Sequence, residues 1–192
     1  VTDDRKEGHG MNADVEQLAA EFCRENGIAV TMSREMPAGY ENAYGTYDVV
    51  VNTLFLNPAM LRDAPEYEKL YYLYHELRHA VQYLCPGRFG VEIQESPAYV
   101  VLYNGICFRL VGNVWQECEL DGPEEYFARA YLSLPYEMDA NAFAYEKVKE
   151  LCGDSAELRE LYGFWMPKER MAYPELETLF RRIDAALDGP GG

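Results

Sequence analysis

The feature that most constrains this 192-residue chain is a pair of histidines four residues apart inside a long stretch of helical periodicity. Leucine, tyrosine and valine recur at helical spacing over 64–84, and the Pro-Gly pair at 86–87 ends the run. On such a helix His75 and His79 project from the same face about one turn apart, so both imidazoles can reach one zinc ion. Glu76 lies at the edge of that face, where a carboxylate can take a proton from a metal-bound water.

A zinc hydrolase usually needs a third protein ligand, and the sequence offers two candidates for it. No histidine follows His79, and Gln82 replaces the glycine that metzincins carry, which excludes that family. Cys85 stands at the offset of the missing histidine. Without that glycine the helix is not expected to end early enough for the Cys85 thiolate to reach the metal. Glu137 opens a later helix, and Asn141 lies four residues on, where it can orient the outer nitrogen of a ligand histidine.

Two motifs in this order resemble gluzincin metallopeptidases, and among them the ImmA/IrrE type. The first motif is H-E-x-x-H at 75–79, and the second is E-x-x-A-N-x-F-A at 137–144. Members of that family are bacterial and phage-associated intracellular proteases that cleave a helix-turn-helix repressor. The resemblance extends over roughly 47–81 and 134–146. One departure is Arg78, which stands where glycine often precedes the second histidine.

The resemblance implies a role for each residue of the two motifs. His75, His79 and Glu137 would bind Zn²⁺, Glu76 would be the general base and acid, and Asn141 would support a ligand histidine from behind. The chain would then be an intracellular zinc endopeptidase in which Glu76 activates the metal-bound water for attack on a peptide carbonyl. An alternative from another class is a zinc-binding regulatory module that cleaves nothing and uses the metal to stabilise its fold.

The expected fold is a single α+β domain of zincin-like type. It would hold a small, mostly antiparallel sheet packed on an active-site helix pair, followed by C-terminal helices. The domain would cover 12–188, with a flexible lead at 1–11, a flexible tail at 189–192 and a β insertion at about 87–122 built on an Asn-Gly hairpin turn. Expected helices are 12–26, 59–62, 64–84, 124–132, 135–151, 155–162 and 174–187, and expected strands are 28–32, 47–51, 54–56, 98–103, 106–111 and 114–120.

The net charge restricts the kinds of binding partner that we expect, and the cysteine pattern restricts the expected cellular compartment. Seventeen lysines and arginines against 33 aspartates and glutamates give a formal net charge of −16, which argues against direct binding of nucleic acid. A basic protein, such as a DNA-binding repressor, is the partner that this charge favours. No apolar run is long enough to span a membrane. Five scattered cysteines without a C-x-x-C pair predict reduced thiols and a cytoplasmic location.

Substrate binding also needs an oxyanion donor and a surface for the peptide. Among the sixteen tyrosines, Tyr136 and Tyr173 are possible donors, although packing roles are commoner for both. The predicted strand at 47–51 is a candidate edge for pairing with an extended peptide, as in gluzincins.

Overall fold

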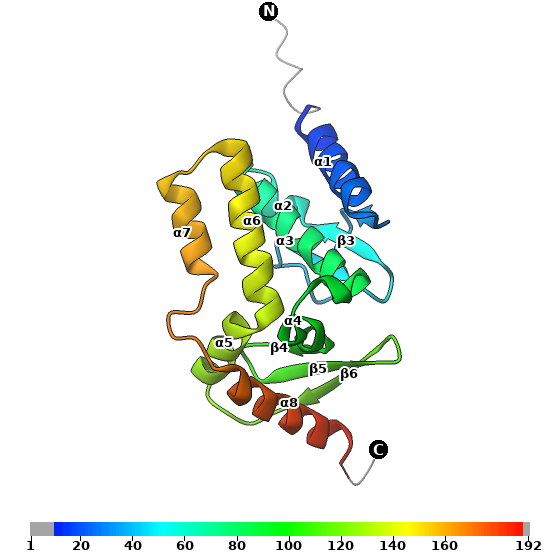
Figure 1. The fold of residues 1–192 in the computed structure, drawn as a ribbon, viewed down its shortest axis with the longest axis vertical. Helices are drawn as coiled ribbons and strands as arrows, with labels where there is room; N and C mark the ends of the chain where they lie inside the picture. The colour runs from blue at the N-terminus through cyan, green and yellow to red at the C-terminus, as the bar shows by residue number, and fades with distance from the viewer. Residues whose placement is uncertain (1–9, 190–192) are drawn as a thin grey trace, which may run out of the picture.

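The computed structural model describes residues 10–189 and confirms the α+β class. Within this range the chain forms eight α-helices and two three-stranded sheets (Figure 1). Most of the expected lead at 1–11 and tail at 189–192 lies outside the described residues, and positions 10 and 11 already belong to the first helix. No helix in the described part is both long enough and apolar enough to cross a membrane.

The N-terminal part builds the first sheet and the long helix α3. Its elements are α1 (Gly10–Asn26), β1 (Thr31–Ser33), β2 (Gly45–Asp48), β3 (Thr53–Leu56), α2 (Pro58–Leu61) and α3 (Glu66–Leu84). Strand β3 is central, with β1 parallel on one side and β2 antiparallel on the other. Asn57 caps α2 by accepting from the amides of Ala59 and Met60, and Pro58 occupies the first helical turn, as the Asn-Pro sequence predicts.

The expected β insertion begins with helical segments that the sequence pattern does not predict. They are the 3₁₀ turn Pro86–Arg88, α4 (Val91–Glu95) and the 3₁₀ turn Ser96–Ala98. An antiparallel sheet of β4 (Tyr99–Val101), β5 (Ile106–Val111) and β6 (Val114–Glu119) follows. The predicted turn at Asn104-Gly105 joins β4 to β5. Gly105 is required there, because its φ is +84° and a Cβ would lie 2.5 Å from the carbonyl oxygen of Leu120.

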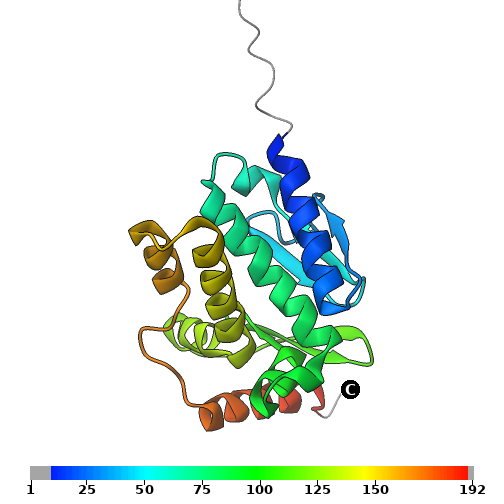
Figure 2. The ribbon, with the colours of Figure 1, turned by 45° about the horizontal axis from the view of Figure 1, so that its top comes forward.

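Four helices complete the fold: α5 (Glu124–Ser133), α6 (Pro135–Cys152), α7 (Ala156–Phe164) and α8 (Tyr173–Leu187). Helix α6 lies alongside α3, and α8 packs on the second sheet (Figures 1 and 2). The buried apolar side chains form two cores. The first core joins α1, the first sheet, α3, α7 and the C-terminal half of α6, whereas the second joins β4, β5, α5, the start of α6 and α8. The two cores therefore share α6.

Candidate metal centre

Three buried side chains from α3 and α6 converge on one point. The Nε2 atoms of His75 and His79 are 3.0 Å apart, and Oε2 of Glu137 lies 3.3 Å from the first and 3.6 Å from the second. Ligands about 2.0–2.1 Å from a tetrahedral zinc ion are about 3.3 Å from one another, so the donor set and its spacing fit a metal ion. A buried His75, His79 and Glu137 group could therefore hold a metal ion.

Local sequence explains why the three donors meet. The histidines are four residues apart on α3, and Glu137 lies in the first turn of α6, immediately after its start at Pro135. Ala140 and Ala144 of α6 are fully buried and small, and α6 packs against α3. Small residues on α6 thus let the two helices approach closely enough for the ligands to meet.

Electrostatics within the centre favour a bound cation. Burial acts to raise the pKa of Glu137, but His79 and His75 outweigh burial and hold that pKa well below its usual value. Burial acts to lower the pKa of His79, but the charge and hydrogen bond of Glu137, together with Glu76 and Gln82, outweigh burial and raise the pKa to about 9. Burial also raises the pKa of Glu76. The ionised Glu137 needs a positive partner because an isolated buried charge is costly, and either a proton on His79 or a bound metal ion supplies one.

Cys85 is not part of the donor group. It caps the C-terminus of α3 and packs against the first core. Among the described residues, the group that could hold a metal contains His75, His79 and Glu137 only. Of the two candidates for the third ligand, the structure brings Glu137 to the histidines.

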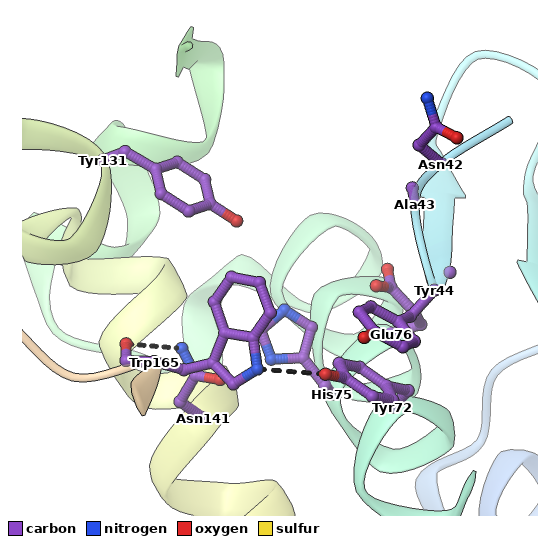
Figure 3. Close-up of a pocket in the computed structure, with 10 residues that line it drawn as sticks. Asn42, Ala43, Tyr44, Tyr72, His75, Glu76, Tyr131, Asn141 and Trp165 are labelled. Carbon is purple, nitrogen blue, oxygen red and sulfur yellow. Dashed lines mark hydrogen bonds between the residues drawn. The ribbon is translucent and has the colours of Figure 1, made fainter. Parts of the chain in front are cut away.

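Asn141 lies next to the centre but does not make the expected bond to a ligand histidine. Its Oδ1 accepts from the hydroxyl of Tyr71 at 2.9 Å. Its Nδ2 donates to the carbonyl of Trp165 at 3.4 Å, the bond drawn in Figure 3. The position four residues after Glu137 does share its helix face, yet it lies one turn further along α6. There Asn141 contacts Tyr71 of α3, one turn before His75, so it bonds to Tyr71 instead of to a ligand histidine.

The outer nitrogen of His79 instead faces Gln82, a residue that the sequence analysis did not assign to the site. Nδ1 of His79 and Oε1 of Gln82 are 2.8 Å apart. Nε2 of Gln82 donates to the carbonyl of Tyr136 at 2.9 Å, and only 1% of Gln82 is exposed. Gln82 lies three residues after His79 on the same helix, and this i, i+3 spacing could have predicted the contact from the sequence.

A pocket of about 180 Å³ opens beside His75 and Glu76 (Figure 3). One wall is aromatic: the rings of Tyr44 and Tyr72 stack at 4.2 Å, and the indole of Trp165 donates to the Tyr72 hydroxyl at 3.1 Å. The pocket is lined by Asn42, Ala43, Tyr44, Gly45, Tyr72, His75, Glu76, Tyr131, Asn141 and Trp165. The catalytic candidate Glu76 and the candidate metal ligand His75 therefore share a small pocket with the four large rings of Tyr44, Tyr72, Tyr131 and Trp165.

The two tyrosines considered as oxyanion donors are engaged elsewhere. The hydroxyl of Tyr136 donates to the carbonyl of Tyr99, and that of Tyr173 donates to the carboxylate of Glu95, each at 3.2 Å. Tyr131, which the sequence analysis did not single out, lines the pocket and directs its hydroxyl into it (Figure 3). Burial and the nearby carboxylates raise the pKa of Tyr131 well above its usual value, so this hydroxyl stays protonated and can donate.

Residues 42–45, which lead into strand β2, form one side of the pocket. Strand β2 is an edge strand, and it spans Gly45–Asp48 rather than the expected 47–51. A Cβ added at Gly45 would lie 3.0 Å from Cγ of Glu76, so glycine allows the strand to lie close to that side chain. The amide of Asn57 donates to the carbonyls of Glu41 and Ala43, each at 2.8 Å, and so fixes the segment that leads into β2.

Comparison of the chain with protein-family models, with curated proteins and with solved structures found no match.

Proposed function

We propose that the protein is a zinc-dependent endopeptidase of the gluzincin type. The observation that carries the proposal is the convergence of His75, His79 and Glu137, with Nε2 and Oε2 atoms 3.0–3.6 Å apart, beside a pocket that also holds Glu76. Nitrogen and oxygen donors in a set of three suit zinc, which in hydrolases leaves a further position for water. A zinc ion bound there would lower the pKa of a water ligand and polarise the carbonyl to be cleaved.

The protein groups around the pocket supply the remaining chemistry. Glu76 accepts the proton of the attacking water and later returns it to the leaving amine nitrogen. Its buried position, which raises its pKa, makes this carboxylate a better proton acceptor than an exposed one. The hydroxyl of Tyr131 donates a hydrogen bond to the carbonyl oxygen as charge develops on it.

The substrate in this proposal is an extended peptide. As the edge strand of its sheet, β2 offers backbone groups for strand pairing, and the aromatic wall of Tyr44, Tyr72 and Trp165 offers apolar contact to one side chain. The net charge of −16 favours a basic protein, such as a DNA-binding repressor. All five cysteines are free thiols, which supports a cytoplasmic location.

The proposal is tested by replacing Glu76 with glutamine, which keeps the size of the side chain but cannot take the proton. We expect Glu76→Gln to keep zinc and to lose peptide hydrolysis by about 10²–10⁴-fold, measured by mass spectrometry on a mixed peptide library. Glu66→Gln is the matched control, because Glu66 is exposed in the first turn of the same helix. Unchanged turnover in Glu76→Gln would refute the role of Glu76.

A second outcome separates the alternative function. If wild type and Glu76→Gln both bind zinc and neither cleaves any peptide, the metal has a structural role in a regulatory module. In that case the removal of zinc lowers thermal stability, and Glu76→Gln retains whatever biological effect the wild type has.

A further inference from the structure

A chain of polar contacts runs from Arg78 to the metal ligand His79. Nε and Nη2 of Arg78 donate to the two carboxylate oxygens of Asp139, at 2.7 and 3.0 Å. Oδ2 of Asp139 also accepts from Nε2 of Gln82 at 2.8 Å, and Oε1 of Gln82 faces Nδ1 of His79 at 2.8 Å. Three of these residues lie on α3 and one on α6, so the chain also joins the two ligand-bearing helices.

These contacts determine how the amide of Gln82 is oriented. Its nitrogen faces two acceptors, the carbonyl of Tyr136 and the carboxylate of Asp139, and so uses both of its hydrogens. Its oxygen must then face His79. Because that oxygen can only accept, the hydrogen of the neutral His79 ring is held on Nδ1, and the lone pair of Nε2 is left facing His75 and Glu137.

Arg78 holds Asp139 in place. Its guanidinium lies 4.6 Å from the ring centroids of both Phe89 and Phe143, and its two hydrogen bonds to Asp139 are parallel. Arginine therefore neutralises the carboxylate and limits its movement. A glycine at this position could not do so.

We propose that Gln82, held by Asp139 and Arg78, is the positioning residue that presents His79 to the metal. Asn141, the residue expected in that role, is bonded to Tyr71 and Trp165 instead. The inference rests on the metal site of the proposed function, but it does not depend on peptide cleavage. Partners of this kind typically contribute about 10–100-fold to metal affinity.

The test compares zinc affinity among variants, measured by competition with a chromophoric chelator. Gln82→Met keeps the length of the side chain and removes its amide, and we expect it to weaken zinc binding by about 10–100-fold. Asn141→Leu, which removes an equally buried amide nearby, should change the affinity by less than about threefold, since it touches neither histidine nitrogen. Gln82→Leu is the second variant if Gln82→Met does not fold.

A spectroscopic readout separates positioning from general stability. In the zinc-loaded wild type, ¹⁵N NMR should show a slowly exchanging Nδ1–H on His79, and this signal should broaden or vanish in Gln82→Met but persist in Asn141→Leu. Equal zinc affinity and an unchanged Nδ1–H signal in Gln82→Met would overturn the inference while leaving the metal site intact. A wild type that binds no zinc would instead overturn the proposed function, and with it the inference.

Discussion

The two cores of the molecule differ in what they bury. Among the described residues, the buried histidines and carboxylates are His75, Glu76, His79 and Glu137, and all four lie where α3 meets α6. The second core buries apolar side chains between β4, β5, α5 and α8, and a set of ion pairs flanks it. There Arg109 bonds Asp184 at 2.9 Å and Asp188 at 2.7 Å, linking β5 to α8.

The difference concerns how each core contributes to the free energy of unfolding. Burying a charge costs free energy unless the charge is paired or bound to a metal, so the four clustered ionisable groups lower the stability of the first core unless they pair with one another or bind a cation. The second core has no such cluster in the described range, and it acts as a scaffold that holds the start of α6 and the pocket residue Tyr131. Mutations in the two regions should therefore have different consequences.

The largest expected effect is on stability, from Phe127→Ala in the second core. Phe127 is 1% exposed and packs under the turns at Gly105 and Gly122. Its truncation should lower the free energy of unfolding by about 3–5 kcal/mol, measured by urea denaturation. Zinc content of the folded variant should not change, whereas loss of zinc would show that the two cores are not separable in this way. Phe164→Ala is the control, because Phe164 is 71% exposed and its loss should cost less than about 0.5 kcal/mol.

The next largest expected effect is on activity, from a change at Tyr131. Tyr131 lies on α5 in the second region but lines the pocket of the first. Tyr131→Phe removes the hydroxyl that points into the pocket and should lower kcat by about 10²–10³-fold, with zinc still bound. Kinetic assays on any peptide identified as a substrate provide the measurement. Tyr126→Phe on the same helix should keep full activity, since Tyr126 contacts Phe127 and Arg182 rather than the pocket. Equal activity in both variants would show that the Tyr131 hydroxyl is not needed and that the second region contributes only to the fold.

The smallest effect is a pH dependence within the first core. Burial, with a contribution from Asp48, raises the pKa of Tyr47 from about 10 to about 12. The folded state thus favours the protonated phenol, so this stabilisation is fully present below pH 10 and is lost as the pH rises toward 12. Relative to Tyr47→Phe, wild type should lose on the order of 1–2 kcal/mol between pH 8 and pH 11.5 in urea unfolding. Tyr103→Phe, at a 61% exposed position, should follow wild type, and an identical pH slope in all three proteins would contradict the expectation.

Much of the fold could be predicted because its signals are local. The periodicity that predicts 64–84 and the Pro135 start of the next long helix give α3 and α6 to within two residues at each end. His75 and His79 lie on α3 and Glu137 on α6, so the group that could hold a metal ion follows from these two helices. The Asn104-Gly105 turn likewise places β4 and β5.

The remainder depends on contacts between distant parts of the chain. Helix α4 has only five residues, too few to form from local propensity, and it is stabilised by packing on α6. The parallel pairing of β1 with β3, with β2 between them in sequence, has no local signature. Gln82 faces His79 with its amide oxygen because Asp139, 57 positions away, accepts from its amide nitrogen. Tyr131 lines the pocket because of where α5 packs, and no sequence motif predicts that packing.

The most direct test of the metal centre is elemental analysis of the purified protein beside two variants. We expect about one zinc ion per chain in wild type and in Glu76→Gln, and little or none in Glu137→Ala, because only the last change removes a donor. A wild type without zinc after preparation in zinc-supplemented medium, or a Glu137→Ala variant that binds zinc as tightly as wild type, would contradict the assignment of His75, His79 and Glu137 as the zinc ligands.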